Sequence, residues 1–140
     1  MGILAIDPGV NKSGFAFSDR LRISMRPLEY LRTEGREERL FEHIEGLLGE
    51  LEISTLLVGM PYHMNGQEGA RAKDVRRLIA ALEERFPHLA VYAYDERLTT
   101  KEAESRLRAE GHGAKAIMRL KDSMSALVLL EDWIASGEPK

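Results

Sequence analysis

The sequence predicts an α/β protein with a mixed five-stranded sheet, three antiparallel strands followed by parallel crossover strands, flanked by helices. Three observations predict this class. Short strand-like segments come first in the chain, amphipathic segments then alternate with short apolar runs, and Pro, Gly or Asn residues separate most of the segments. The order three strands, helix, strand, helix, strand, helix, helix is typical of a sheet that is extended by crossover units.

The first three segments are predicted to be antiparallel strands. Gly2–Asp7 (GILAID) is an apolar run that ends at a Pro-Gly turn, and Ser13–Asp19 (SGFAFSD) alternates apolar and polar residues. A third strand is expected over Ile23–Leu31, where Pro27 requires an edge position or a bulge because proline cannot donate to a neighbouring strand.

The rest of the chain alternates helices with two short strands. Apolar residues from Glu37 onward recur at one-face helical spacing, as they do in the segment that Pro87 ends. We expect a final helix that begins at Asp122, with Asp122 as its N-cap, after a Gly-His-Gly loop. The other expected elements are a helix from Glu37, a strand Leu56–Met60, a helix Ala70–Phe86, a strand Leu89–Tyr94 and a helix from Thr99 or Thr100 to Leu107.

The composition fits one globular domain. The chain has 140 residues, of which 44% are hydrophobic and 31% charged, so we expect a single domain over residues 1–137 and a frayed tail over 138–140. No apolar run approaches the roughly 20 residues that cross a bilayer, and no signal-peptide pattern opens the chain, so a cytoplasmic protein without a membrane partner is expected. The absence of cysteine excludes disulfides and thiolate catalysis.

Three carboxylates are the candidates for chemistry. Asp7 ends the first strand, Glu96 follows the last strand, and Asp122 lies on the final helix. Because the carboxyl ends of strands in an open α/β sheet face one crevice, these side chains could converge there. Carboxylates in such a cluster repel one another unless a cation neutralises them, and Mg²⁺ or Mn²⁺ prefers this ligand type. The reaction class that this arrangement indicates is metal-dependent phosphodiester hydrolysis.

Three blocks of sequence resemble the YqgF/RuvX family of Holliday-junction-resolvase-like and pre-16S rRNA nucleases, which have an RNase H-like fold. The blocks are AIDPGVNKSGFAFSD, LLVGMPYHMNGQEG, and YDERLTTKEAE with KDSMSALVLLEDWI, and with their spacing they cover nearly the whole chain. The resemblance implies that Asp7, Glu96 and Asp122 are the acidic residues of the active site, with Asp95 as the alternative metal ligand at the second position.

Further polar residues are candidates for substrate binding. Arg97 could bind a phosphate through two parallel hydrogen bonds, Thr99 and Thr100 could donate to phosphate at a helix start, and Asn65 lies in a loop that would flank the crevice. Simpler roles stay open: Asp7 as a turn residue, Glu96 as an ion-pair partner of Arg97, and the basic residues after Ala70 as a solvated helix face. His63 and His112 are expected to be solvated loop residues rather than metal ligands.

The resemblance favours processing of the 16S rRNA precursor, and other functions stay open. A Holliday-junction-resolvase-like DNA endonuclease acting in recombination or repair would need two active sites and hence a homodimer, whereas an rRNA nuclease could be a monomer. A noncatalytic nucleic-acid-binding module for ribosome assembly would bind without turnover. The net charge of -3 counts against a protein that coats nucleic acid nonspecifically. The Asp-Pro-Gly turn also resembles a phosphate loop of actin-like ATPases, but those proteins need a second comparable domain.

Overall fold

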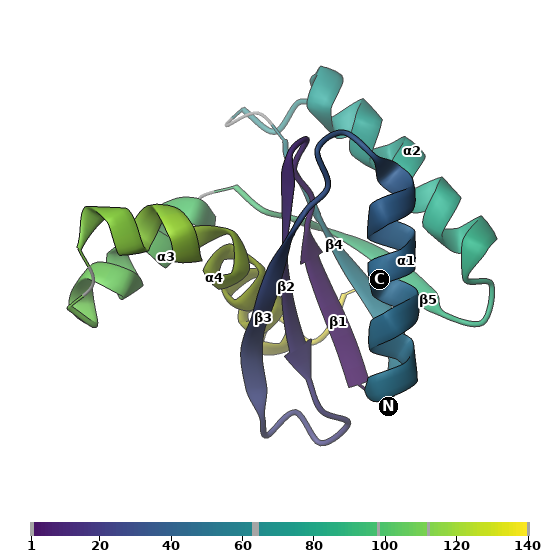
Figure 1. Cartoon of the computed structure of the whole chain (residues 1–140), viewed down its shortest axis with the longest axis horizontal. Coiled ribbons are helices and arrows are strands. Elements are labelled where there is room, and N and C mark those ends of the chain that lie inside the picture. Colours follow the sequence, from purple (N-terminus) through teal and green to yellow (C-terminus); the bar gives the residue numbers. More distant parts are fainter. Residues whose placement is uncertain (1, 63–64, 98, 112, 140) are drawn as a thin grey trace.

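The computed structural model has the predicted mixed sheet between two layers of helices (Figure 1). It describes residues 2–62, 65–97, 99–111 and 113–139, without the side chains of residues 99–100 and 114–122. Along the chain the elements are β1 (Gly2–Asp7), β2 (Lys12–Ser18), β3 (Met25–Arg32), α1 (Glu37–Glu50), β4 (Ile53–Met60), α2 (Ala70–Arg85), β5 (Ala90–Asp95), α3 (Thr99–Ala109) and α4 (Ala114–Ala135). In the part of the chain that is described, no helix is long and apolar enough to span a membrane.

The strand order β3-β2-β1-β4-β5 follows from the way in which the segments are connected. β1 and β2 pair antiparallel, with Asp7 opposite Gly14, and β2 pairs antiparallel with β3. β4 then returns parallel to β1, and β5 lies parallel to β4, because a helix crosses over before each of them. The expected edge position of Pro27 is confirmed, since β3 has β2 as its only neighbour in the sheet described.

Each face of the sheet has its own hydrophobic core. α1 and α2 cover one face over side chains such as Leu4, Ile6 and Val58, and α4 covers the other over Ile3, Ala5 and Leu57. β1 is therefore buried on both faces, which explains why its sequence is a continuous apolar run rather than an alternating one.

Most predicted boundaries lie within two residues of the observed ones, and two differ by more. β4 begins at Ile53 rather than Leu56, because Ile53 and Thr55 pair with Gly2 and Ile3 of β1 although Ser54 and Thr55 are polar and only half-buried. α4 begins at Ala114, after Gly113 as N-cap, so Asp122 lies well inside the helix and is not its N-cap. The segment before Asp122 consists mostly of good helix formers, and no Gly or Pro interrupts it.

The carboxyl-terminal residues have partners in the fold. Arg22, in the β2–β3 turn, binds both carboxylate oxygens of Glu138, with Nε to Oε2 at 2.9 Å and Nη2 to Oε1 at 3.1 Å. The Trp133 indole donates to the carbonyl oxygen of Pro139 at 2.9 Å. Lys140 lies outside the described residues, and the frayed tail over 138–140 stays a prediction.

Candidate active site at the ends of β1, β4 and β5

Strand alternation brings three positions to the α4 face at one end of the sheet. The α4 core takes one side chain from near the end of each of three strands: Ala5, Leu57 and Tyr94. Because successive side chains point to opposite faces, the residues two positions further on lie on the same face. These residues are Asp7 on β1, Gly59 on β4 and Glu96 just after β5.

The Glu96 carboxyl group reaches across β4 to Asp7, and Gly59 leaves it the space to do so. Asp7 and Glu96 are joined by a side-chain hydrogen bond. A Cβ atom on Gly59 would overlap the Glu96 carboxylate oxygen and would lie 3.2 Å from its Cδ and 3.3 Å from Cδ2 of Leu129. The missing side chain at position 59 therefore allows the two carboxyl groups to meet over the middle strand.

Glu96 has the electrostatics of a partly desolvated acid. Burial raises the pKa of Glu96 above its usual range, and the charge of Asp95 raises it further, while the hydrogen bond with Asp7 and the charge of Arg71 lower it. Two carboxyl groups can be hydrogen-bonded to each other only if they share a proton. The two carboxyl groups thus concentrate negative charge at one place. The shared proton partly neutralises this charge, and a metal cation could neutralise it instead.

Asp95 and Arg97 form a separate arrangement at the surface. Arg97 donates to Oδ2 of Asp95 through Nε at 2.6 Å, and its backbone N–H donates to Oδ1 at 2.9 Å. A Cβ atom on Gly66 would lie 3.6 Å from Nη1 of Arg97, so the 65–67 loop lies beside this guanidinium. Asn65 is exposed and holds the loop through Oδ1, which accepts the N–H of Gln67 at 3.0 Å. The predicted candidates Arg97 and Asn65 therefore lie near each other at the end of β5.

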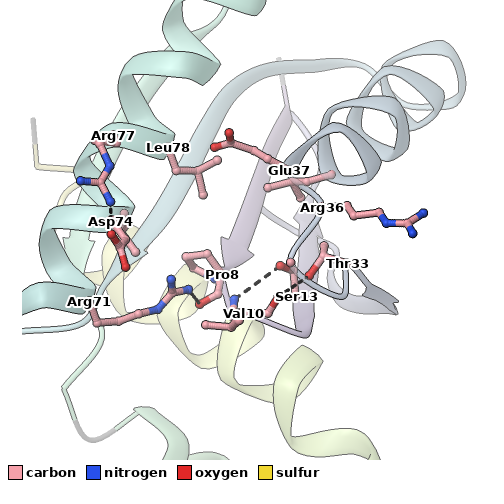
Figure 2. A pocket seen from close by; sticks show the side chains of 14 residues that line it. Pro8, Val10, Ser13, Thr33, Arg36, Glu37, Arg71, Asp74, Arg77 and Leu78 are labelled. Atoms are coloured by element: carbon pink, nitrogen blue, oxygen red, sulfur yellow. Dashed lines mark hydrogen bonds and ion pairs between the residues drawn. The ribbon is translucent and has the colours of Figure 1, made fainter.

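Two residues that the sequence analysis did not single out belong to this region. Gly59 carries a signal that could have found it, since a lone glycine inside a buried strand often marks the close approach of another group. Arg71 was one of several basic residues on α2, but it is half-buried, and its Nη2 donates to the carbonyl oxygen of Pro8 at 2.9 Å (Figure 2). Arg76 and Arg77 instead pair with Glu68 and Asp74 on their own segment.

The structure does not describe all of the predicted site residues. Thr99 and Thr100 form the start of α3, and Asp122 lies on α4, but their side chains are outside the described set, as are His63 and His112. Among the side chains that are described, no three acidic or histidine residues lie close enough together to hold a metal ion. Asp7 and Glu96 are the two predicted ligands that the described structure brings together.

Solved structures with the same arrangement of strands and helices define the class of fold. Thermus thermophilus RuvC in complex with a Holliday junction substrate superposes with a TM-score of 0.61 at 17% identity, covering 100% of this chain and 98% of that one. The Fowlpox virus resolvase in complex with Holliday junction DNA has a TM-score of 0.62 at 10% identity, covering 99% and 100%. The fold is therefore RNase H-like, of the kind that these resolvases have.

The sequence itself assigns the chain more narrowly: it belongs to the RuvX family, described as "Holliday junction resolvase", which it matches over residues 1–136. It is 38% identical over 134 residues to a protein of Anaeromyxobacter sp. (strain Fw109-5), covering 96% of both chains. It is 34% identical over 139 residues to one of Geobacillus sp. (strain WCH70), covering 99% of this chain and 100% of that one. Both relatives are named "Putative pre-16S rRNA nuclease".

Proposed function

We propose that this protein is a divalent-metal-dependent nuclease that hydrolyses phosphodiester bonds at an end of the 16S rRNA precursor. The observation that carries the proposal is the hydrogen-bonded pair of Asp7 and Glu96, which is half-buried at the end of the sheet beside a basic helix. The names of the relatives support the RNA substrate, and membership of the RuvX family supports a nuclease.

The donor set of this site fits a hard divalent cation. Asp7 and Glu96 offer carboxylate oxygens only, which are the ligands that such cations prefer. Partial desolvation disfavours two ionised carboxylates in hydrogen-bonding contact unless a cation replaces the shared proton. When bound, Mg²⁺ or Mn²⁺ supplies the positive charge that activates water and neutralises the leaving oxygen. Glu96 is the better ligand at the second position, because Asp95 is engaged by Arg97.

Asp122 is the proposed third ligand, and the course of α4 supports it. The next residue, Ser123, donates to the carbonyl oxygen of Leu28 at 2.6 Å. Leu28 is paired with Phe15, and Phe15 with Ile6, the residue before Asp7. Leu28 on β3 is therefore two strands away from β1. At the usual spacing of about 4.8 Å between neighbouring strands, the backbone of α4 near position 122 lies about 10 Å from the end of β1, measured across the sheet. A helix that crosses this end of the sheet could supply a ligand from above.

The chain's own groups have distinct roles in this scheme. The charge of Arg71 favours the ionised form of Glu96 and thus the ligand state of the pair. Arg97 and Asn65, at the exposed end of β5, would contact phosphates of the substrate, with Arg97 first released from Asp95. Thr99 and Thr100, in the first turn of α3, would add hydroxyl donors.

The test is a cleavage assay that compares wild type with Asp7→Asn on a pre-16S rRNA fragment and on a four-way DNA junction. We expect Mg²⁺- or Mn²⁺-dependent cleavage of the RNA and a loss of at least about a thousandfold in Asp7→Asn, because a metal ligand and a charge are lost together. Asp19→Asn is the matched control, since Asp19 also follows a strand but holds a turn by accepting the N–H of Ile23 at 3.0 Å.

The outcomes separate three functions. Cleavage of the junction alone, by a dimer in solution, would make the protein a resolvase. Binding to RNA without turnover at any metal concentration would make it a noncatalytic assembly module. Cleavage that persists in Asp7→Asn would overturn the assignment of the site.

A further inference from the structure

A pocket of about 470 Å³ opens at the same end of the sheet as the carboxylate pair but on the face that α1 and α2 cover, between these helices and the turn after β1 (Figure 2). Pro8 and Gly9 line it and follow Asp7 directly in the chain. Two residues span at most about 7 Å, so the pocket begins within that distance of the Asp7 backbone. Arg71 connects the two places, because it lines the pocket, donates to Pro8 and acts on the pKa of Glu96.

The lining of this pocket is apolar at its base and carries charged groups at its rim. Leu40, Val75 and Leu78 are nearly fully buried and form the base between the two helices. Val10 also lines the pocket and is 61% exposed, so it offers an accessible apolar group to a ligand. An apolar base with a few polar groups is what binding sites for flat organic groups have, and the volume lies in their usual range of about 300–1,000 Å³.

The rim offers one carboxylate without a partner among the described residues. Glu37, in the first turn of α1, is exposed, and no hydrogen bond or ion pair of its side chain is found in the described part of the chain. Figure 2 shows its carboxylate turned toward the α2 side, above Leu78. Asp74, across the pocket on α2, is by contrast paired with Arg77. Glu37 is therefore the acceptor that an incoming ligand would meet.

We propose that this pocket binds an unstacked guanine base of the substrate strand, next to the phosphodiester that is cleaved. The proposal rests on the proposed nuclease function and adds a base preference to it. A base has apolar faces that suit the pocket base and Val10, and its edge is read by hydrogen bonds when it is splayed out of a single strand. Guanine presents two adjacent donors on its Watson–Crick edge, N1–H and N2–H, and a carboxylate accepts both.

The other bases match Glu37 less well. Adenine and cytosine present one amino group beside an acceptor nitrogen, which a carboxylate repels, and uracil presents one N–H between two carbonyl oxygens. The negative charge of Glu37 near a nucleic acid backbone is offset by Arg71 and Arg77, which line the same pocket. These arginines would lie close to the phosphates on either side of the bound base.

The experiment measures base preference in binding and in cleavage. Oligonucleotides of one parent sequence are made as RNA and as DNA. Each position around the cleaved bond is replaced in turn by each of the four bases and by inosine. Each oligonucleotide is tested with wild type, Glu37→Gln and Glu38→Gln. We expect wild type to prefer G at one position by about 5- to 150-fold, the value of a good bidentate contact. Inosine, which lacks the 2-amino group, should lose part of this preference.

Glu38→Gln is the matched control, because Glu38 is the neighbouring residue on the same helix turn but pairs with Arg85, away from the pocket. The preference for G should disappear in Glu37→Gln and persist in Glu38→Gln. The same base profile in wild type and Glu37→Gln, or equal binding and cleavage of all bases, overturns the proposal. If no substrate is cleaved, the nuclease function fails, but the binding profile still decides whether the pocket selects guanine.

Discussion

Replacing Gly59 by alanine should disable the site without touching any charged residue. The new Cβ would lie where the Glu96 carboxylate now lies, with Leu129 of α4 packed 3.3 Å away on its other side. The backbone of β4 cannot yield, because it is paired with β1 and β5 on both sides. Glu96 must therefore move away from Asp7, and the two ligands of the proposed metal separate.

The size of the effect follows from this geometry. To restore an ordinary contact of about 3.5 Å, the carboxylate must shift by roughly 1 Å, and a misplacement of that size costs about a hundredfold in rate. Overpacking a well-filled core costs about 1–3 kcal/mol of unfolding free energy. For a chain of this length that lowers the melting temperature by about 3 to 10 °C. The protein should thus stay folded at 25 °C while its nuclease activity drops.

The assay compares the metal-dependent cleavage rate and the melting temperature of Gly59→Ala with those of Gly46→Ala. Gly46 lies within α1, and a Cβ added there meets nothing within 4 Å, so this change should leave cleavage unaltered and stabilise the helix by up to about 1 kcal/mol. If Gly59→Ala cleaves as fast as wild type, Glu96 does not need its place over β4 and the reasoning is refuted.

Three further predictions concern charged residues around the site. Without metal, the unfolding free energy of wild type should fall as pH rises from about 4.3, the pKa of Glu in the unfolded chain, to the raised pKa of Glu96 in the folded protein, because the folded state holds the proton more tightly. In thermal melts with chelator, Glu96→Gln should flatten this dependence on pH. Added Mg²⁺ should restore the stability of wild type but not that of Glu96→Gln. Arg71→Ala should raise the pKa of Glu96 further and, because the same positive charge also repels a cation, should tighten Mg²⁺ binding at a pH where Glu96 is ionised, measured by titration calorimetry, more than Lys73→Ala does. Asp122→Asn should reduce cleavage at least a hundredfold, since the proposed third ligand is lost, whereas Asp132→Asn on the same helix should not.

Each of these has a clear contrary result. An unchanged pH slope in Glu96→Gln would mean that another group holds the proton. Equal Mg²⁺ affinities in the Arg71 and Lys73 variants would remove Arg71 from the site. Full activity in Asp122→Asn would leave Asp7 and Glu96 as the acidic residues required for cleavage.

The order of elements could be predicted because hydrophobic periodicity is a local property of the chain. The apolar run of β1 and the one-face spacing of α1 and α2 each predicted the right type of element near the right place. The start of α4 could not be predicted in this way, since the residues from Ala114 to Lys121 have good helix propensity but no clear one-sided pattern. The residue type of Asp122 favours an N-cap in isolation, so the sequence alone predicts a helix start that the structure does not have.

What the sequence by itself determined is the type and order of the elements and the family, together with the acidic residues that are candidates for the site, because these depend on residue identity and spacing along the chain. What only the tertiary structure decided is which groups meet. Asp7 and Glu96 are separated by most of the chain and touch because β4 lies between their strands and carries a glycine at the crossing point. Arg71 is distinguished from the other basic residues of α2 by its hydrogen bond to Pro8 and by the effect of its charge on the pKa of Glu96. Such contacts are set by strand order and side-chain alternation across the sheet, which no local pattern contains.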